Sequence, residues 1–514
     1  MFSKVNSMGL QGFRAEQVHV ECDLSSGLPR FDLVGLPDSA VSEAKERVRS
    51  AIKNCGLEFP ISRITVNLAP AEFKKEGPLY DLPILVAILL ASKQIKVNLD
   101  SAALIGEIAL NGEVRKVNGV LPMVARAKEL ELTEFYIPVD NCDEASLIPD
   151  ILIYPVKDVR QLLLHFSGTE KMTPLKNMTF EEIQKSMIKQ SDDNIDFADV
   201  LGQKCAKRAL EIAAAGGHNV LLVGSPGAGK SMLAKRLPTI LPDMTFEESL
   251  ATSSIYSVAG LLTKEKPLIL ARPFRSPHHT TTDVAFAGGG AKAKPGEVSL
   301  SHNGVLFLDE LPLFTRSALE TLRQPLEDGK VTVTRNAVTA TYPGSIMLVC
   351  AMNPCPCGYL YDPVHPCTCT DAAKARYLSR ISGPLLDRID LQVMVDPLDA
   401  YALYNRDTSL EETSATIKAR VTAARNIQLE RFAGSDVVCN AGMTPRMVRK
   451  YCVMTPDAKS LLIKAFTQMN FSARANDKIL RTARTIADLD GSPVIDVPHI
   501  AEAIQFRRMD CLFK

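Results

Sequence analysis

The amino-acid sequence predicts a multidomain α/β and α+β protein, with an α+β first domain, a core built on a parallel sheet and an all-helical end. The chain of 514 residues is too long for one hydrophobic core and, at roughly 150 residues per domain, suggests about three. A glycine-rich motif between a strand and a helix lies near the middle, and the pattern after residue 396 is almost wholly helical. We expect a domain over residues 1–165, a linker over 166–195, a core over 196–396 and a helical lid over 397–514.

The composition argues against a strongly basic or membrane-embedded protein. Lysine plus arginine and aspartate plus glutamate balance at 59 each, so nucleic-acid binding would need local basic patches or a ring of subunits. The N-terminus lacks the apolar core of a secretion signal, and the most apolar run, residues 82–92, is too short to span a bilayer. Outside one cluster of four, the twelve cysteines are scattered singly, as in a reducing compartment. We expect a cytoplasmic protein with no membrane partner.

The first domain shows both strand and helix patterns. The stretches EQVHVEC (residues 16–22) and RITVNLAP (63–70) alternate apolar and polar side chains, as half-buried strands do. The stretch SAVSEAKERVRSAIKNCG (39–56) fits one amphipathic helix that ends at Gly56. The linker that follows is polar and irregular, with a short helical patch inside it.

A phosphate-binding loop opens the core. The motif G-x-x-x-x-G-K-[ST] is matched within NVLLVGSPGAGKS, which runs from an apolar strand into a helix. Small residues let backbone N–H groups cradle phosphate oxygens, while Lys230 neutralises the outer phosphates and the Ser231 hydroxyl binds Mg²⁺. The predicted nucleotide-binding residues are Gly224, Ser225, Pro226, Gly227, Ala228, Gly229, Lys230 and Ser231. ATP and Mg²⁺ are the cofactors that this motif predicts.

Two further strands end in polar residues. In GVLFLDEL, Asp309 is expected to hold Mg²⁺, and Glu310 is expected to orient and deprotonate the attacking water. The strand SIMLVCAMN ends in Asn353, whose amide can bond to the γ-phosphate or the water; the alternative is a turn-forming residue before Pro354. A phosphate loop, an Asp-Glu pair and then a strand ending in Asn is the order of AAA+ ATPases, where that Asn is called sensor 1.

An arginine finger is expected in ISGPLLDRIDLQV. Arg388 there would reach the neighbouring subunit's site in a ring and stabilise charge on the γ-phosphate, an effect of roughly 10³ to 10⁵ in rate. An ion pair within the chain to Asp387 or Asp390 is the alternative role. Arg380 is a rival finger candidate.

A second arginine is expected from the helical lid. Arg474 lies near the start of a helix in FSARANDKILRTARTIADLDG and is the candidate for sensor 2, which reaches the phosphates. Arg481 and Arg484 lie further along the same helix, where structural or intersubunit contacts are expected.

Four cysteines crowd into NPCPCGYLYDPVHPCTC. Cys355, Cys357, Cys367 and Cys369 form two C-x-C pairs, with His365 in reach. Four thiolates can bind Zn²⁺ tetrahedrally, and free cysteines are the alternative. A disulfide is not expected in the cytoplasm.

Basic residues concentrate in two inserted segments, residues 272–297 and 329–340. These segments carry too many Gly, Thr and basic residues for core elements, and positively charged side chains there can track phosphates. A solvated basic loop is the alternative for each of them. The candidates are Arg272, Arg275, Lys292, Lys294, Lys330 and Arg335.

Nine stretches spread along almost the whole chain form one characteristic set: FDLVGLPDSAVSEAKERVRSAI, RITVNLAPAEFKKEGPLYDLP, GSPGAGKSMLAKRLP, RPFRSPHHTTTDVAFAGGG, PGEVSLSHNGVLFLDELPLF, LRQPLEDGKVTVTR, AMNPCPCG, SGPLLDRIDL and RTARTIADLDG. Through them the chain resembles the magnesium-chelatase-like AAA+ ATPases of the ComM type almost from end to end. The resemblance implies a Lon-protease-like N-terminal domain of the ribosomal S5 domain 2-like fold, an AAA+ core, a helical lid and a hexameric ring.

The Lon-like resemblance does not extend to peptidase chemistry. The serine position of the Lon motif corresponds to Leu79, and the lysine position falls at or beside Leu121. Leucine provides neither a nucleophile nor a base, so no peptide hydrolysis is expected. The domain is expected to serve as a scaffold or as a platform for a protein partner.

The resemblance implies an ATP-driven homo-hexamer that acts on single-stranded or branched DNA, as a helicase or in branch migration during homologous recombination and natural transformation. A chaperone-like remodeller of a protein partner, as in the metal-inserting chelatases, is the alternative. The chain carries no D-x-S-x-S motif to recruit a chelatase partner subunit, which favours DNA.

Overall fold

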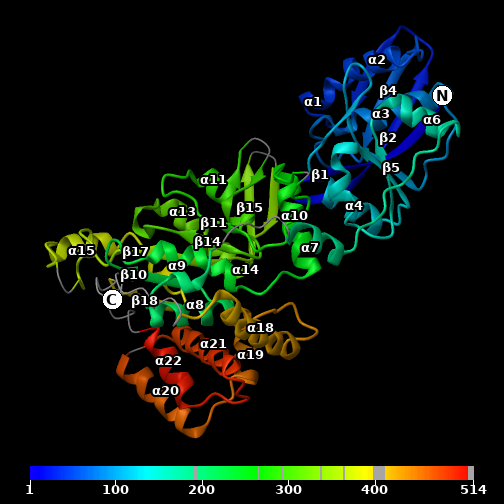
Figure 1. The fold of residues 1–514 in the computed structure, drawn as a ribbon. Coiled ribbons are helices and arrows are strands. Elements are labelled where there is room, and N and C mark those ends of the chain that lie inside the picture. Colours follow the sequence, from blue (N-terminus) through cyan, green and yellow to red (C-terminus); the bar gives the residue numbers. More distant parts are fainter. Residues whose placement is uncertain are drawn as a thin grey trace.

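The computed structural model describes residues 1–188, 195–263, 265–290, 293–335, 338–362, 365–397, 411–469 and 471–507. Figure 1 shows an N-terminal region set to one side of a central α/β core, with a helical C-terminal region packed against the core on another side. Among the described residues, no helix has both the length and the apolar character to cross a membrane.

The N-terminal region is built on one mixed sheet of seven strands. Its strands are β1 (Phe2–Gln11), β2 (Arg14–Ser25), β3 (Arg30–Val34), β4 (Arg63–Ala69), β5 (Ala102–Leu104), β8 (Glu134–Pro138) and β9 (Leu152–Val156), with β6 (Glu107–Ile108) and β7 (Val114–Arg115) as a separate pair. They lie in the order β3-β4-β2-β1-β5-β8-β9. The helices are α1 (Ser39–Ser42), α2 (Ala44–Asn54), α3 (Asp81–Ala91), α4 (Val120–Glu129), α5 (Cys142–Ala145) and α6 (Val159–Phe166).

The predicted strands of this region form because alternate side chains face its core. In β2, Val18, Val20 and Cys22 are fully buried, as the period of two requires. The single helix expected over residues 39–56 is instead two helices, α1 and α2. A tightened turn at Glu43 separates the two helices. The Glu43 carbonyl accepts a hydrogen bond from the N–H of Glu46, three residues further along the chain.

The core sheet is wholly parallel, as expected. Its strands are β10 (Val220–Gly224), β11 (Phe274–Arg275), β14 (Val305–Leu308), β17 (Met347–Met352) and β18 (Leu391–Val395). They lie in the order β11-β14-β17-β10-β18, so the carboxyl ends of β14, β17 and β10 meet at one edge. Two hairpins pack against each other beside the core sheet: β12 (Gly288–Gly289) with β13 (Lys294–Pro295), and β15 (Lys330–Arg335) with β16 (Val338–Pro343).

The helices of this part of the chain are α7 (Phe180–Ile188), α8 (Lys204–Gly216), α9 (Lys230–Arg236), α10 (Phe246–Ala259), α11 (Asp283–Ala287), α12 (Glu297–Leu300), α13 (Arg316–Thr321), α14 (Arg323–Asp328), α15 (Asp371–Leu378) and α16 (Gly383–Leu386). Every residue of helix α15 is at least partly exposed, and Ile183 of α7 is buried in the hydrophobic core of the N-terminal region. The first of these helices, α7, is the helical patch expected inside the linker.

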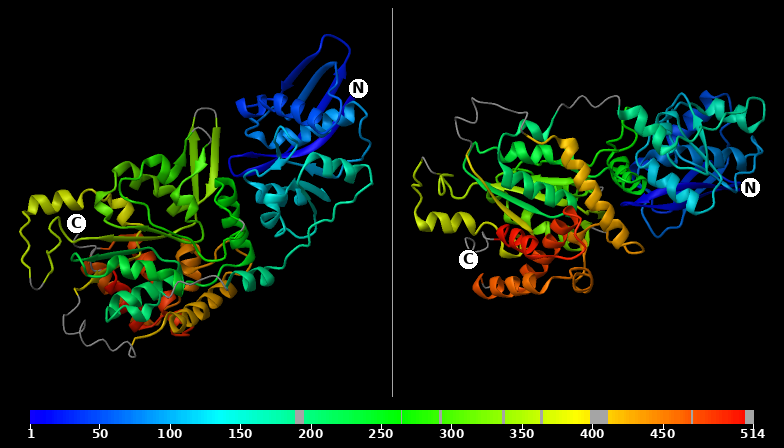
Figure 2. Two further views of the ribbon diagram at one scale, coloured as in Figure 1. Left: turned by 45° about the horizontal axis from the view of Figure 1, so that its top comes forward. Right: turned by 60° about the horizontal axis from the view of Figure 1, so that its bottom comes forward.

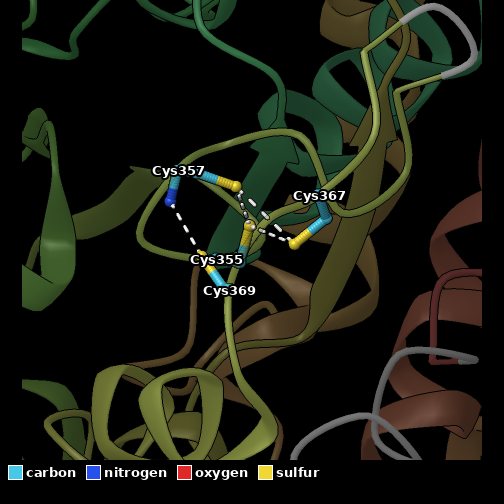
Figure 3. Close-up of side chains that lie close together, drawn as sticks. All are labelled: Cys355, Cys357, Cys367 and Cys369. Carbon is cyan, nitrogen blue, oxygen red and sulfur yellow. Dashed lines mark hydrogen bonds between the residues drawn. The ribbon is translucent and has the colours of Figure 1, made fainter.

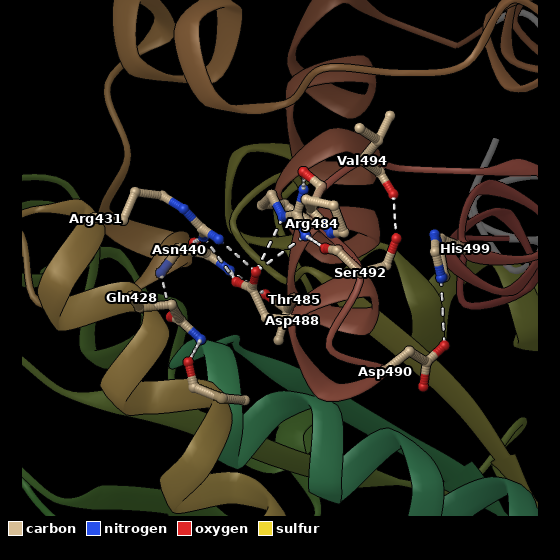
Figure 4. A network of polar contacts seen from close by, with 12 residues as sticks. Gln428, Arg431, Asn440, Arg484, Thr485, Asp488, Asp490, Ser492, Val494 and His499 are labelled. Carbon is tan, nitrogen blue, oxygen red and sulfur yellow. Dashed lines mark hydrogen bonds and ion pairs between the residues drawn. The ribbon is translucent and has the colours of Figure 1, made fainter.

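The C-terminal region is helical in its described residues. Its helices are α18 (Ser414–Arg431), α19 (Pro445–Tyr451), α20 (Pro456–Met469), α21 (Ala473–Leu489) and α22 (Val497–Gln505). Arg484, on α21, is 1% exposed and bonds to Asp488, which also accepts from Arg431 of α18 (Figure 4). This buried network ties α18 to α21 and confirms the structural role expected for Arg484.

The N-terminal region contacts the core through α10 and the β15–β16 hairpin (Figure 2). The Ser257 hydroxyl of α10 donates to buried Glu144 at 2.6 Å. Phe13, in the β1–β2 turn, packs edge-on against Tyr342 of β16, with ring centroids 6.2 Å apart. The hairpin therefore joins the two regions.

Candidate active site

The phosphate loop connects β10 to α9 at the carboxyl edge of the core sheet. Gly227 and Gly229 have φ angles of 79° and 91°, which glycine adopts without the Cβ penalty of other residues. An added Cβ at Gly227 would meet nothing within 4 Å. The loop is therefore open on that side, as a phosphate cradle has to be.

The lysine of the motif is held at the centre of the site. Lys230 Nζ donates to the carbonyls of Gly224 and Ser225 at 2.7 and 2.9 Å, and to Asn353 Oδ1 at 3.1 Å. Burial lowers the pKa of Lys230, and the charges of Asp309 and Glu310 oppose that shift. A buried ammonium group with carbonyl partners is poised to exchange them for phosphate oxygens.

A pair of oxygen ligands lies beside the lysine. Ser231 Oγ donates to Asp309 Oδ2 at 2.6 Å, although 78 residues separate them in the sequence. A hydroxyl and a carboxylate are ligands that suit Mg²⁺, which keeps several waters in such sites. The donor set therefore fits a magnesium nucleotide.

Glu310 follows Asp309 in a strained conformation. Its φ of 52° lies in the left-handed region, which costs a non-glycine residue of order 1 kcal/mol. The conformation leaves its side chain 57% exposed at the strand end. The carboxylate thus stands outside the packed core, where water can reach it.

His279 is a contact of Glu310 that the sequence analysis missed. Its Nδ1 lies 3.7 Å from Glu310 Oε2, and its neighbour His278 bonds instead to Thr280. The position of the stretch SPHHT in the sequence could have predicted this contact. The stretch directly follows β11, and β11 pairs in parallel with β14, so the carboxyl ends of the two strands meet at one edge of the sheet.

Arg388 and Arg474 lie at the opposite edge of the sheet. Both line a cavity of about 600 Å³ that also includes Asn219, just before β10, and Asp390, just before β18. Strand β10 is five residues long, with a rise of about 3.3 Å per residue. The phosphate loop follows the carboxyl end of this strand, and the cavity lies at its amino end. Within the described residues, neither arginine forms a hydrogen bond to Lys230 or to the side chains of Asn353, Ser231 and Asp309.

Neither expected pairing of Arg388 is found. Its guanidinium bonds to the Glu327 carboxylate and, at 2.6 Å, to the Pro384 carbonyl. The partner is thus Glu327, rather than Asp387 or Asp390. The rival finger, Arg380, is exposed and donates to the Pro312 carbonyl at 3.4 Å.

The cysteines of both C-x-C pairs converge. The sulfurs of Cys355, Cys357, Cys367 and Cys369 lie within 4.8 Å of one another (Figure 3). His365 is not among them, because its ring bonds to Asp362 at 3.2 Å. The structure thus supplies four sulfur donors and leaves the histidine outside.

Two of the basic candidates are committed elsewhere. Arg272 pairs with Glu248 at 2.8 Å, and Arg275 forms two bonds of 2.7 Å to Glu297. Both guanidinium groups are therefore engaged in ion pairs within the core, and the structure does not present them as free charges for phosphates. Lys292 and the Arg335 side chain lie outside the described residues.

The phosphate loop contacts the Asp-Glu end of β14 and the Asn353 end of β17, and the sheet that holds these strands is parallel. Together with the helical C-terminal region, this arrangement defines an AAA+ ATPase of the chelatase type. Three family models match: "Magnesium chelatase, subunit ChlI" over residues 196–403, "Subunit ChlI of Mg-chelatase" over 20–141, and "Magnesium chelatase, subunit ChlI C-terminal" over 411–507. The chain belongs to this magnesium-chelatase ChlI family.

Curated relatives extend over nearly the whole chain. Competence protein ComM of Haemophilus influenzae is 43% identical over 98% of this chain and 97% of its own length. The uncharacterized protein YifB of Escherichia coli is 40% identical over 99% and 98%. A magnesium-chelatase 67 kDa subunit of Chlorobaculum parvum is 29% identical over 42% of this chain and 29% of its own length.

Proposed function

We propose that this chain is an ATP-hydrolysing homo-hexameric motor that acts on single-stranded or branched DNA, as a helicase or in branch migration during homologous recombination and natural transformation. The observation that supports an ATP-hydrolysing motor is that four side chains lie together at one edge of the sheet: Lys230, Asn353, Ser231 and Asp309. ATP and Mg²⁺ are its cofactors, and a structural Zn²⁺ at the four cysteines is part of the proposal.

The proposed chemistry assigns one task to each side chain. Ser231 and Asp309 would hold Mg²⁺, which supplies charge neutralisation at the phosphates. Glu310 accepts a proton from the attacking water, and its exposed carboxylate supports that role. Asn353 orients the water or the γ-phosphate, and its bond to Lys230 places it at the phosphate end of the loop.

The positions of Arg388 and Arg474 relative to the sheet support the proposed ring. Arg388 and Arg474 share a cavity at the edge away from their own phosphate loop, so they fit a neighbour's nucleotide better than their own. We assign Arg388 as the finger and Arg474 as sensor 2, both acting on the adjacent subunit. The finger role requires the Arg388 guanidinium to leave Glu327 when the ring forms.

The DNA assignment is supported by the relatives and by the β12–β13 and β15–β16 hairpins. The Haemophilus relative bears the name of a competence protein. Lys294 and Lys330 begin β13 and β15, are exposed, and have no ion-pair partner in the part of the chain that the structure describes. Such lysines are available to phosphates.

The N-terminal region is assigned to the Lon-like fold as a platform for a protein partner. Leu79, at the serine position of the Lon motif, and Leu121, at or beside its lysine position, are buried in the core at 7% and 0% exposure. Because the motor consumes ATP, the proposal places it in the cytoplasm. Remodelling of a protein partner is the alternative, suggested by the chelatase subunit among the relatives.

ATP turnover of the purified chain, measured alone and with single-stranded, duplex or branched DNA, tests the proposal. Stimulation by DNA is the expected result. Basal turnover with no response to any DNA would favour the protein-remodelling alternative, and an absence of turnover under all conditions would contradict the motor.

Replacing His279 by alanine is expected to lower ATP turnover roughly tenfold while leaving nucleotide affinity within about twofold. The reason is that His279 Nδ1 lies 3.7 Å from Glu310 Oε2, where we propose that it orients the carboxylate that activates water. Turnover and binding of a fluorescent ATP analogue are measured separately. His278→Ala is the matched control, since that ring bonds to Thr280. Equal turnover in the two variants would remove His279 from the site.

Changing Lys292, Lys294, Lys330 and Arg335 together to alanine is expected to abolish DNA stimulation and weaken DNA binding. Each lost phosphate contact lowers the slope of log affinity against log salt by about 0.7 on single strands. Basal turnover and ring assembly are expected to stay unchanged. DNA binding is measured by fluorescence anisotropy over a salt series.

The matched control for this variant removes four exposed charges from the helical region: Arg446, Lys450, Lys459 and Lys464. It is expected to bind DNA as the unchanged protein does. If both variants bind DNA normally, the hairpins are not the DNA site, and the N-terminal region becomes the next candidate.

A further inference from the structure

The four-cysteine loop has the dimensions of a tetrathiolate metal site. The Cys355 and Cys357 sulfurs lie 3.3 Å apart, and each lies 3.6 Å from the Cys367 sulfur. Tetrahedral Zn²⁺ with Zn–S bonds of about 2.3 Å needs sulfurs about 3.8 Å apart. A small expansion of the cluster would therefore seat the ion.

One backbone amide is directed at the sulfur cluster. The N–H of Cys357 donates a hydrogen bond to Cys369 Sγ at 3.4 Å. A donor aimed at sulfur favours the thiolate, the form of cysteine that binds metal. The N–H of Gly358 instead donates to the Cys355 carbonyl at 3.0 Å and closes a turn around Cys357.

The loop packs on both catalytic segments. Cys355 follows Asn353 by two residues, and Asn353 accepts from Lys230. On its other side, Gly358 lies against the phosphate loop: an added Cβ would be 2.5 Å from Pro226 Cδ and 3.8 Å from Asn353 Cγ. One glycine of the cysteine loop therefore touches both the phosphate loop and sensor 1.

We infer that Cys355, Cys357, Cys367 and Cys369 bind one Zn²⁺ and that this ion fixes the loop that holds Asn353 and Pro226 in place for ATP hydrolysis. The ion is structural and stays four-coordinate, with no open position for substrate. Its link to hydrolysis rests on the proposed function, whereas its binding does not.

Metal content tests the site directly. The full chain, purified without added metal, is expected to contain one zinc per chain, and Co²⁺ exchanged into it is expected to show the visible spectrum of a tetrahedral thiolate site. Cys367→Ser with Cys369→Ser is expected to lose the zinc, and the exposed Cys205→Ser is the matched control that keeps it. A chain without stoichiometric zinc and without that cobalt spectrum, or one with disulfides among these cysteines, would overturn the site.

A second variant separates zinc binding from its effect. Gly358→Ala keeps all four sulfurs, but the added methyl group pushes the loop against Pro226. Zinc-reconstituted protein is therefore expected to turn over ATP about 10- to 100-fold more slowly, the range found when residues that orient the ligands of a site are changed. Circular dichroism confirms that it folds. Unchanged turnover in this variant and in the zinc-free double variant would overturn the positioning role.

The inactive Lys230→Ala variant distinguishes the two proposals. It is expected to hold one zinc per chain while hydrolysing no ATP, because Lys230 contacts Asn353 but not the cysteine sulfurs. Loss of zinc in this variant would contradict a site formed by the cysteine loop alone. If the unchanged protein bound zinc but hydrolysed no ATP, the motor proposal would fail and the zinc site would stand.

Discussion

Lys230→Ala is expected to weaken nucleotide binding by about 100-fold, whereas Glu310→Gln is expected to leave binding intact and lower turnover by roughly 10² to 10⁴-fold. The first change removes the one positive charge buried among the phosphate-loop carbonyls. The second removes only the carboxylate that accepts a proton from water, so ATP stays bound and intact. Binding of a fluorescent ATP analogue and release of phosphate are measured separately.

Two neighbouring substitutions serve as controls. Lys235→Ala changes an exposed lysine later in the same helix, and Glu247→Gln neutralises an exposed glutamate outside the site. Both are expected to bind and hydrolyse ATP normally. Equal loss of binding in Lys230→Ala and Glu310→Gln would show that Glu310 is not the catalytic base.

Arg388→Ala is expected to lower ATP turnover by roughly 10³-fold and to be rescued in part by subunits that carry Lys230→Ala. Each variant alone has no complete site, since the finger and the phosphate loop that it serves belong to different subunits. A mixed ring contains interfaces where an intact phosphate loop meets an intact finger. Turnover is measured across mixing ratios, with mixed rings verified by native mass spectrometry.

The placement of Arg388 makes this test sharp. It shares a cavity with Arg474 at the edge of the sheet away from its own Lys230. Mixing Lys230→Ala with Glu310→Gln is the negative control, because both changes lie in one nucleotide site and every interface stays incomplete. Absence of recovery in verified mixed rings containing Arg388→Ala would count against the finger and favour Arg380.

Local patterns in the chain predicted much of the fold. Alternation over residues 16–22 and 63–70 follows from the pleat of a strand with one buried face, and both stretches are strands. The break at Glu43 escaped prediction, because an amphipathic period does not report a single tightened turn. The parallel core was predictable because apolar strands alternated with helices.

The nucleotide site could also be predicted, since its residues occupy fixed positions at strand ends. Lys230 and Asn353 are 123 residues apart in the sequence, yet parallel pairing of β10 with β17 brings them within 3.1 Å. The order of these strands in the sequence was sufficient, because the carboxyl ends of parallel strands share one edge.

The partners of side chains outside such motifs depend on packing that no local pattern encodes. Arg388 pairs with Glu327, 61 residues earlier in the chain, rather than with its neighbours in sequence. His279 reaches Glu310 because two strand ends meet, and Gly358 reaches Pro226 because the cysteine loop folds back over the phosphate loop. The sequence therefore specified the elements and the chemistry at their ends through short-range periodicity and motif spacing. The edge of the sheet at which Arg474 lies, and the loop that packs against Asn353, were decided by the three-dimensional packing of segments far apart in the chain, where shape and burial select the contacts.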